Sequence, residues 1–425
     1  MSGGIKLNKL LINGGSRLKG EIIVQGSKNA VLPILSATLL TDDECVIHNC
    51  PCISDVFSSL EIFRGLGCRA EYKDKRVEIC TANTDETRIP EKLMKKMRSS
   101  VMFLGPLLAK RGEATICRPG GCRLGERPID IHVDSLKMLG AKIDEAGDCI
   151  FCRLEKVKSG KVVLLYPSVG ATENVMMMCA GSGAEVKLIN PAREPEIVDL
   201  QNFLNRMGAD IRGAGSDTIM IYPRTKLSGC EYSVIPDRIV GATYCTMTAM
   251  CGGEVCLKNI ICSHIGVVTE VLSRAGCSVR EEESSIIIKA DKKLNCIRSL
   301  KTLPYPGFPT DAQPLLSAAM TMAEGTSHIS ETIFENRFRY AEELIKMGAD
   351  IQFIGGTLLI KGVRRLYGRE VCAHDLRGGA ALVGAGLSAE GQTFIDGVEF
   401  IDRGYENIES ALRELGADIH RIKRI

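Results

Sequence analysis

The sequence predicts an α/β protein of six repeated units, each about 70 residues long and three to a domain. Three observations support this fold class. A glycine that follows a helical pattern recurs six times at nearly constant spacing. Predicted helices alternate with short strand patterns throughout the chain. The 425 residues also exceed the length that one hydrophobic core usually spans, so two domains are expected.

The repeat is defined by glycines that lie 73, 68, 68, 72 and 68 residues apart, namely Gly67, Gly140, Gly208, Gly276, Gly348 and Gly416. Apolar residues at i, i+4 and i+7 precede several of them, as in Val56, Leu60 and Phe63, and place one apolar stripe on a helix face. The glycine then predicts the left-handed residue that ends such a helix. A short strand follows, for example at residues 209–211 and 349–353.

Each unit also contains an earlier and more apolar helix, expected at residues 29–40, 100–108, 313–322 and 380–387. A turn and a strand follow, as at residues 45–47 and 393–395. One unit is therefore predicted as strand, buried helix, strand, amphipathic helix and strand.

Counting back 37 to 42 residues from each repeat glycine gives the residue near the start of each buried helix: Lys28, Arg98, Gly170, Arg238, Asp311 and Arg377. Helix N-termini attract anions through free N–H groups and the helix dipole. Simple capping explains Asp311 and Ser168, but it does not explain the four cations. If the six N-termini point inward, they form one polyanion-binding centre between two domains.

Residues 119–128 place Cys122 among three glycines and two arginines, closed by a proline. Neighbouring cations lower the pKa of a thiol and favour the reactive thiolate. Arg127 can also bind a carboxylate or phosphate with two parallel hydrogen bonds. Two interpretations stay open from these residues alone: a reactive cysteine beside an anion site, or an ordinary surface turn.

Composition excludes several functional classes. Hydrophobic content is 45% and net charge only +2, so no global field draws nucleic acid, and no window is long and apolar enough for a bilayer. The start of the chain has no apolar signal segment, which predicts a reducing, cytoplasmic location. Eighteen cysteines include one CxxC, at 149–152, without a second pair at zinc-ligand spacing. Neither a metal nor a cofactor is expected.

Eight ordered blocks resemble the UDP-N-acetylglucosamine enolpyruvyl transferases, of the same superfamily as the shikimate-phosphate enzyme of aromatic biosynthesis. The blocks are residues 26–30, 97–100, 121–132, 167–172, 307–311, 336–338, 375–377 and 402–406. The likeness runs from about Leu11 to the C-terminus. Ser99, Tyr166 and His374 depart from the usual pattern, and they affect fine substrate contacts rather than the reaction.

The resemblance implies an inside-out α/β barrel in each of two domains, with helices buried and sheets outside. It assigns residues 21–235, which include Cys122, to one domain, and residues 1–20 with 236–425 to the other. It also implies transfer of the enolpyruvyl group of phosphoenolpyruvate to the 3-hydroxyl of UDP-N-acetylglucosamine, with release of phosphate. This reaction is the first committed step of peptidoglycan synthesis, and the resemblance also implies a target of fosfomycin.

The resemblance further implies a role for each matching residue. Cys122 is the acid that protonates the methylene carbon, and Asp311 is the base for the attacking hydroxyl. The phosphoenolpyruvate ligands are Lys28, Asn29, Arg127, Arg337, Arg377 and Arg403. The UDP-sugar ligands are Asn29, Arg98, Arg127, Pro128, Ile129, Asp130, Ile131, Ser168, Val169, Gly170, Asp311 and Ile333.

Interpretations without a functional role exist for single residues. Arg337 and Arg403 are ordinary exposed arginines in this interpretation, Asp375 only caps a helix, and Lys28 lies in a plain turn. Two alternatives exist for the whole chain. A non-catalytic repeat scaffold gives no reason for the Cys122 segment, and a 3-phosphoshikimate 1-carboxyvinyltransferase does not need it. The oligomeric state is not predicted.

Overall fold

A computed structural model describes residues 8–84, 86–117, 129–147 and 149–423. They form two compact units. Unit 1 contains the described residues of 8–25 and 236–423, and unit 2 contains those of 26–117 and 129–235. Strand β2 (Leu18–Ile23) pairs with β14 (Gly253–Lys258), which ties the first segment of the chain to unit 1.

Unit 1 has three sheets of four strands, each mixing parallel and antiparallel pairs. The first has the order β21 (Glu370–Cys372), β22 (Gln392–Asp396), β1 (Asn8–Asn13) and β23 (Asp418–Lys423). The second has the order β15 (Ser278–Glu281), β16 (Ser285–Ala290), β14 and β2. The third has the order β17 (Leu300–Lys301), β18 (Thr326–Ser330), β20 (Thr357–Lys361) and β19 (Asp350–Ile354).

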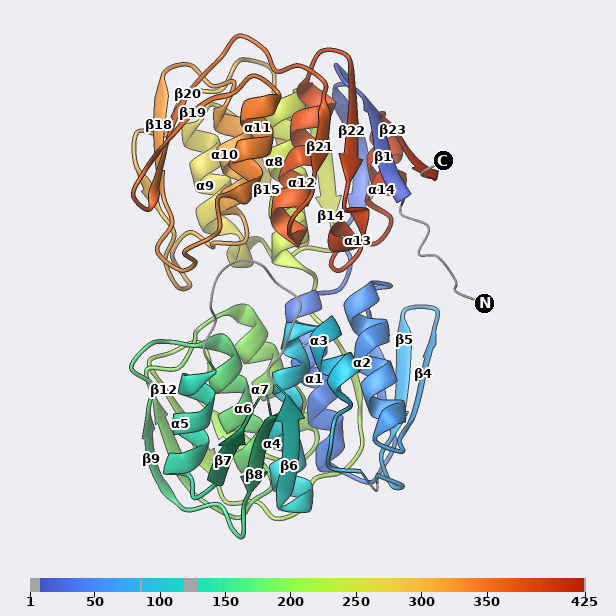
Figure 1. The fold of residues 1–425 in the computed structure, drawn as a ribbon, viewed down its shortest axis with the longest axis vertical. Helices are drawn as coiled ribbons and strands as arrows, with labels where there is room; N and C mark the ends of the chain where they lie inside the picture. Colours follow the sequence, from blue (N-terminus) through green and yellow to red (C-terminus); the bar gives the residue numbers. More distant parts are fainter. Residues whose placement is uncertain (1–7, 85, 118–128, 148, 424–425) are drawn as a thin grey trace. The chain divides into compact units, whose positions relative to one another are not determined.

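Three helices form the centre of unit 1: α8 (Arg238–Cys251), α10 (Gln313–Met320) and α12 (Leu376–Ser388). They pack against one another and are buried almost throughout. Figure 1 shows them inside the sheets, in yellow-green, orange and red. Helices α9 (Gly266–Arg274), α11 (Arg339–Lys346) and α14 (Ile408–Glu414) are buried on one face, and η3 (Cys262–His264) and α13 (Val398–Ile401) are short.

Unit 2 follows the same plan. The first sheet has the order β13 (Glu231–Ser233), β3 (Cys45–His48), β5 (Arg76–Cys80) and β4 (Arg69–Lys73). The second has the order β11 (Asp210–Arg212), β12 (Thr218–Tyr222), β10 (Val186–Ile189) and β9 (Gly160–Val163). The third has the order β6 (Glu113–Cys117), β8 (Cys149–Arg153) and β7 (Lys142–Ala146). The last sheet has three strands, and a single parallel bridge between Arg88 and Thr115 lies at its edge.

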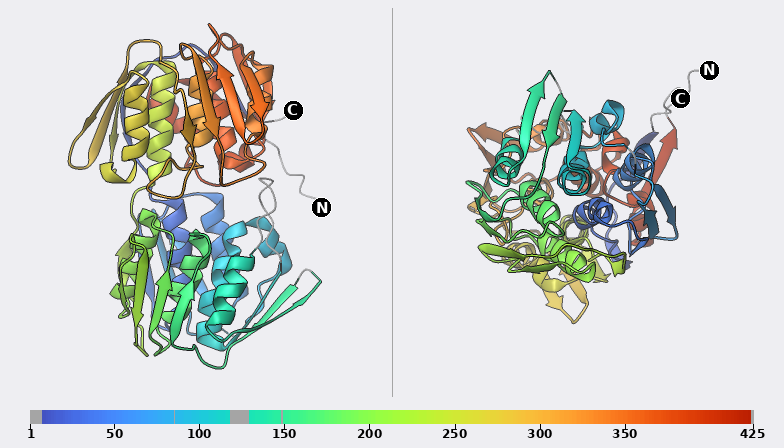
Figure 2. Two further views of the ribbon diagram at one scale, coloured as in Figure 1. Left: turned by 90° about the vertical axis from the view of Figure 1, so that its left-hand side faces the viewer. Right: turned by 90° about the horizontal axis from the view of Figure 1, so that it is seen from below.

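The buried helices of unit 2 are α1 (Lys28–Ala37) with η1 (Thr38–Leu40), η2 (Arg98–Phe103) with α4 (Leu104–Arg111), and α6 (Val169–Cys179). The outer helices are α2 (Ser54–Gly65), α5 (Asp130–Met138) and α7 (Pro195–Arg206), with the short α3 (Glu91–Lys96). Figure 2 shows, from below, the helices of this unit end-on and strands around them.

The repeat glycines confirm the register of the units. Gly67, Gly140, Gly208, Gly276, Gly348 and Gly416 all have positive φ, between 88° and 112°. Each directly follows the helix C-cap residue, where a residue with a Cβ would be strained. The spacing of the glycines in the sequence therefore reports a repeated helix end.

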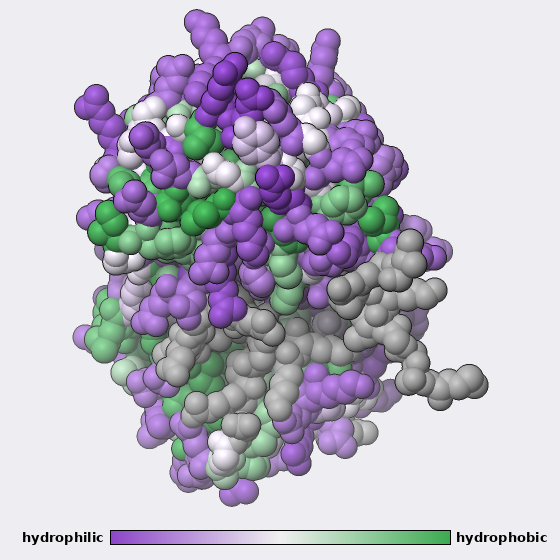
Figure 3. Space-filling view, turned by 45° about the horizontal axis from the view of Figure 1, so that its top comes forward, coloured by the Kyte–Doolittle hydropathy of each residue, from purple (hydrophilic) through white to green (hydrophobic). Residues whose placement is uncertain are grey.

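The surface and the cysteines agree with a packed α/β protein. Hydrophilic side chains cover most of the face in Figure 3, with apolar ones scattered among them. Among the described residues, none of the helices combines the length and apolar character that a membrane crossing requires. The described His, Cys, Asp and Glu residues form no group of three or more suited to a metal ion. In the CxxC segment, the sulfur of Cys149 lies 2.8 Å from that of Cys117 on the paired strand.

Candidate functional site

In unit 1 the N-termini of α8 and α12 are capped by carboxylates. Asp237 accepts from the backbone N–H groups of Ile239 (2.8 Å) and Val240 (3.0 Å). Asp375 accepts from those of Arg377 and Gly378, both at 3.0 Å. Helix α10 begins differently, because its N-cap residue is Ala312 and makes no side-chain hydrogen bond. Asp311 therefore stands one residue before the N-cap position, not at the position that the capping interpretation expects.

Asp311 instead contacts two arginines. Its Oδ1 accepts from a terminal nitrogen of Arg337 at 2.9 Å, and its Oδ2 lies 3.5 Å from Nε of Arg377. Both arginine side chains are only 2% exposed, whereas that of Asp311 is 28% exposed. The carboxylate thus lies at the open edge of a buried cationic pair, where it can reach a ligand.

The two buried arginines have hydrogen-bonding capacity to spare. Nε of Arg337, and Nε and Nη1 of Arg377, are buried without a hydrogen-bond partner among the described residues. Leaving a buried charged donor unpaired is costly, so such groups indicate a ligand that accepts from them. A carboxylate or phosphate matches planar guanidinium donors best. Arg337, predicted in one alternative to be an ordinary exposed arginine, is 1% exposed and belongs to this cluster.

Arg377 is held in its charged form by its surroundings. Burial lowers the pKa of this guanidinium, but the neighbouring Tyr405, Asp311 and Asp237 outweigh burial and raise it. The guanidinium carbon lies 5.4 Å from the centre of the Tyr405 ring. Because Asp237 caps α8, Asp311 precedes α10 and Arg377 is the second residue of α12, the N-terminal ends of the three central helices meet at this cluster.

Arg403 lies on the turn after α13, two residues before Tyr405, whose ring contacts Arg377. The turn is fixed on one side by Asp402, which forms two 2.7 Å bonds with Arg421. On the other side Gln25 donates to the carbonyl of Gly404 (3.1 Å) and accepts from the N–H of Glu406 (2.8 Å). These bonds orient the turn from residues that are distant in the sequence.

In unit 2, Lys28 is the first residue of α1 and Asn29 the second. Ser27 caps this helix through the N–H of Ala30. Nζ of Lys28 lies 2.8 Å from Oδ2 of Asp55, and the two side chains are 11% and 4% exposed. The plain-turn interpretation of Lys28 is therefore wrong, because the ammonium is held at a helix N-terminus by a buried carboxylate.

Ser168 caps α6 by accepting from the N–H of Ala171, and Val169 and Gly170 form the first turn. A Cβ on Gly170 would lie 2.8 Å from Cε1 of His132, so a larger residue here would have to displace this ring. His132 bonds to the fully buried Asn174 at 3.0 Å. Asn174 also accepts from the N–H of Gly105 at 2.7 Å, which links α6 to α4 and α5.

The remaining predicted residues divide into two groups. Arg98 begins η2, Ile129 precedes α5, and Asp130 and Ile131 form the first turn of α5. Ile333 lies in the loop after β18 and belongs to unit 1. Cys122, Arg127 and Pro128 lie outside the described residues. Within the part that the structure describes, the fold brings Asp311, Arg337 and Arg377 together.

Several partners escaped the sequence analysis. Asp55 and Asp237 lie outside the blocks that carry the resemblance, and no local signal connects them to residues far away in the chain. His132 ends one of these blocks, but its bond to Asn174 cannot be read from spacing. Tyr405 and Asp375 stand inside the predicted blocks, but their packing against Arg377 and Arg337 cannot be read from spacing. An aspartate one residue before a helical arginine, as in Asp237-Arg238, is the one available signal, since it marks an N-cap.

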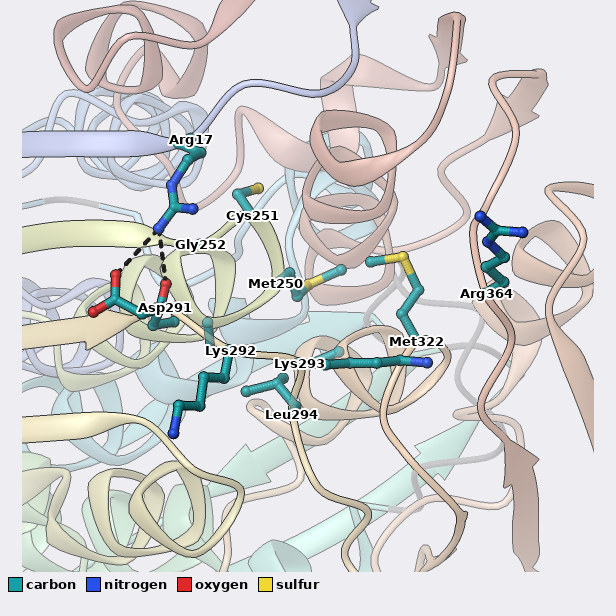
Figure 4. Close-up of a pocket in the computed structure, with 13 residues that line it drawn as sticks. Arg17, Met250, Cys251, Gly252, Asp291, Lys292, Lys293, Leu294, Met322 and Arg364 are labelled. Carbon is teal, nitrogen blue, oxygen red and sulfur yellow. Dashed lines mark hydrogen bonds and ion pairs between the residues drawn. The ribbon is translucent and has the colours of Figure 1, made fainter.

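A cavity of about 270 Å³ in unit 1 is not this site (Figure 4). It is lined by the C-terminal ends of α8 and α10, with Met250, Met322 and Lys293, whereas the arginine cluster lies at the N-terminal ends. Cations near helix C-termini compensate the negative end of the helix dipole. The lysines and arginines that line this cavity are therefore explained by the helix dipole without a bound ligand.

Replacing Asn174 with alanine tests whether its hydrogen bonds stabilise the packing of α6 against α4 and α5. The Asn174→Ala variant leaves the buried N–H of Gly105 without its acceptor, which typically costs about 1–3 kcal/mol. We expect a lowered melting temperature relative to the wild type, measured by differential scanning calorimetry. The exposed Asn83 is the matched control, and Asn83→Ala should melt like the wild type. Equal melting temperatures for the two variants would contradict the support role.

The chain is similar to known proteins over almost its whole length. The family model described as EPSP synthase (3-phosphoshikimate 1-carboxyvinyltransferase) matches residues 12–412. The UDP-N-acetylglucosamine 1-carboxyvinyltransferase 2 of Caldanaerobacter subterraneus is 46% identical over 98% of this chain and 100% of its own length. The UDP-N-acetylglucosamine 1-carboxyvinyltransferase 1 of Carboxydothermus hydrogenoformans is 44% identical over 98% and 99%.

Solved structures share the fold. The enolpyruvyl transferase NikO from Streptomyces tendae superposes with a TM-score of 0.90 at 24% identity, covering 99% of this chain and 100% of that one. An EPSP synthase from Acinetobacter baumannii gives 0.74 at 20% identity, covering 98% and 100%. At these identities the likeness concerns the fold, which is the mixed α/β fold of the enolpyruvyl transferases.

Proposed function

The chain belongs to the UDP-N-acetylglucosamine 1-carboxyvinyltransferase family of enolpyruvyl transferases, and from this premise we propose how it acts. It transfers the enolpyruvyl group of phosphoenolpyruvate to the 3-hydroxyl of UDP-N-acetylglucosamine and releases phosphate. The reaction is the first step of peptidoglycan synthesis. Relatives 44–46% identical over nearly the whole chain support this assignment.

The reaction proceeds by addition and elimination. The 3-oxygen forms a bond to C2 of phosphoenolpyruvate while a proton is added to its methylene carbon, giving a tetrahedral ketal. The bond from C2 to the phosphate oxygen then breaks as a proton leaves the new methyl group. In our assignment Asp311 takes the hydroxyl proton and Cys122 supplies the proton to carbon. Concentrated negative charge in the ketal calls for preorganised cations.

One observation carries the assignment of the residues in unit 1. Two buried arginines, with N–H groups lacking partners among the described residues, lie beside a carboxylate that is partly open. A substrate carboxylate would accept from Arg337 and Arg377, and Asp311 would then lie beside the reacting carbon. Arg403 joins Lys28 and Arg127 as a phosphate ligand.

The finer architecture is part of the proposal. Two inside-out α/β domains of three repeats each, divided near residues 21 and 235, fit the buried helices of each unit. The UDP-sugar ligands are assigned to Asn29, Arg98, Arg127, Pro128, Ile129, Asp130, Ile131, Ser168, Val169, Gly170, Asp311 and Ile333. A cytoplasmic location stays a prediction.

A second acceptor has one observation in its favour, since the matching family model bears the description of 3-phosphoshikimate 1-carboxyvinyltransferase. Phosphate release from phosphoenolpyruvate, measured with each acceptor in turn, separates the two. We expect release with UDP-N-acetylglucosamine and none with shikimate 3-phosphate. The reverse preference would reject the proposed function.

Replacing Arg403 tests the phosphate assignment. Arg403→Ala removes a charge-assisted contact to phosphate, so capture of phosphoenolpyruvate and stabilisation of the ketal should weaken together. We expect kcat/KM for phosphoenolpyruvate to fall by about 100-fold, because a charged hydrogen bond contributes about 1.5–3 kcal/mol. Affinity for UDP-N-acetylglucosamine, measured by calorimetry, should change little. Unchanged kcat/KM for phosphoenolpyruvate would contradict the role.

A further inference from the structure

Glu331, the residue after β18, has a carboxylate that accepts four hydrogen bonds. Its Oε1 accepts from the hydroxyl of Thr302 (2.9 Å) and from the backbone N–H groups of Ile333 (2.7 Å) and Phe334 (3.2 Å). Its Oε2 accepts from the hydroxyl of Thr310 at 2.9 Å. One side chain therefore joins the segment after β17, the segment before α10 and the loop that leads to Arg337.

The bond to Thr310 acts on the residue next to Asp311. Helix α10 has no side-chain cap, so the turn before it is not fixed in that way. The hydroxyl of Thr310 is held by Glu331, and its carbonyl accepts from Arg337 at 3.0 Å. Both bonds restrain the backbone from which the Asp311 carboxylate projects.

The bonds to Ile333 and Phe334 act on the arginine. The guanidinium carbon of Arg337 lies 5.8 Å from the centre of the Phe334 ring. Fixing the N–H of Phe334 thereby restrains one wall of the arginine side chain, and Arg337 in turn bonds Asp311 at 2.9 Å. Glu331 thus reaches Asp311 along two routes, through Thr310 and through Phe334 with Arg337.

We propose that Glu331, acting through the hydroxyl of Thr310, is a positioning residue that sets the orientation of the Asp311 carboxylate for proton abstraction. This inference rests on the proposed function, in which Asp311 is the base. Misplacing a catalytic group by about 1 Å can cost about 100-fold in rate, because reaction requires aligned atoms. Glu331 touches no reacting atom in this account, so its effect is on geometry alone.

The test compares matched valine substitutions in one sheet region. Thr310→Val deletes the hydroxyl that bonds Glu331, and Thr310→Ser keeps it. Thr357→Val is the control, because the Thr357 hydroxyl bonds at 2.7 Å to Ser330, which is the last residue of β18 and directly precedes Glu331. Thr310 and Thr357 are both half-buried, so the two valine variants should lose similar thermal stability.

We expect Thr310→Val to lower kcat by about 10-fold or more, with KM for both substrates within about threefold. Thr310→Ser should recover kcat to within about threefold, and Thr357→Val should match the wild type. In a double-mutant cycle, Thr310→Val should add little to the kcat loss of Glu331→Ala, because that variant already removes the partner of the Thr310 hydroxyl.

Two results would overturn the inference by itself: equal kcat for Thr310→Val and Thr357→Val, or failure of Thr310→Ser to recover activity. Independent, multiplying effects of Glu331→Ala and Thr310→Val on kcat would overturn it as well. The wild-type measurement separates these failures from failure of the proposed function. Absence of phosphate release by the wild type with UDP-N-acetylglucosamine would overturn both.

Discussion

The Asp311→Asn variant should lose turnover by about 100- to 10,000-fold while still binding UDP-N-acetylglucosamine within about tenfold of the wild type. Asparagine keeps the size of the side chain, but it cannot accept the proton of the attacking hydroxyl. The loss should appear in kcat, measured by phosphate release, rather than in the dissociation constant from calorimetry.

Asp396→Asn is the matched control for this prediction. Asp396 forms a 2.9 Å ion pair with Lys9 and is 29% exposed, close to the 28% of Asp311. Both variants remove the charge of an aspartate of similar exposure, but only Asp311→Asn should lose turnover. Its fall in melting temperature should be the larger of the two, because Asp311 faces two arginines that are 2% exposed. Near-normal turnover of Asp311→Asn with a clearly lowered melting temperature would leave Asp311 a structural residue.

Cys122 should be the cysteine that fosfomycin alkylates, and UDP-N-acetylglucosamine should promote the reaction. Two neighbouring arginines favour its thiolate, which is the nucleophile that opens an epoxide. Peptide mapping by mass spectrometry after brief treatment checks this among all eighteen cysteines. Cys122→Asp should resist the epoxide and keep partial turnover, since a carboxylic acid can still donate a proton.

The other thiols explain why selectivity is expected. Burial raises the pKa of Cys50, Cys152 and Cys245 to about 12, which leaves little thiolate near neutral pH. Cys230 is the strongest competitor, because a hydrogen bond from Cys45 lowers its pKa. Label on Cys230, or label spread evenly over exposed thiols, would contradict the assignment of Cys122.

The repeated architecture could be predicted because its signals are local. A glycine with positive φ follows the end of the same helix in every unit, and a continuous apolar run marks α12, whereas polar residues interrupt α6 and α8. Both follow from residues within a few positions of one another. The pairing of strands into sheets was harder to predict from the sequence, since parallel pairs such as β2 with β14 join segments more than 200 residues apart.

The environment of the site residues could not be predicted for the same reason. The phase of the repeat locates Asp311 near a helix start, where capping is the default expectation. Only the fold brings Arg337 and Arg377 against it and leaves α10 without a side-chain cap. Likewise, the partner of Lys28 is Asp55 on the neighbouring helix, which no spacing rule connects to it.

The most direct test of the proposed function is identification of the product. The wild-type chain is incubated with phosphoenolpyruvate and UDP-N-acetylglucosamine, and the nucleotide sugar is analysed by mass spectrometry and carbon NMR. Our account predicts an enolpyruvyl ether on the 3-oxygen of the sugar, with one phosphate released for each ether formed. Phosphate without the ether, or an unchanged UDP-sugar, would contradict it.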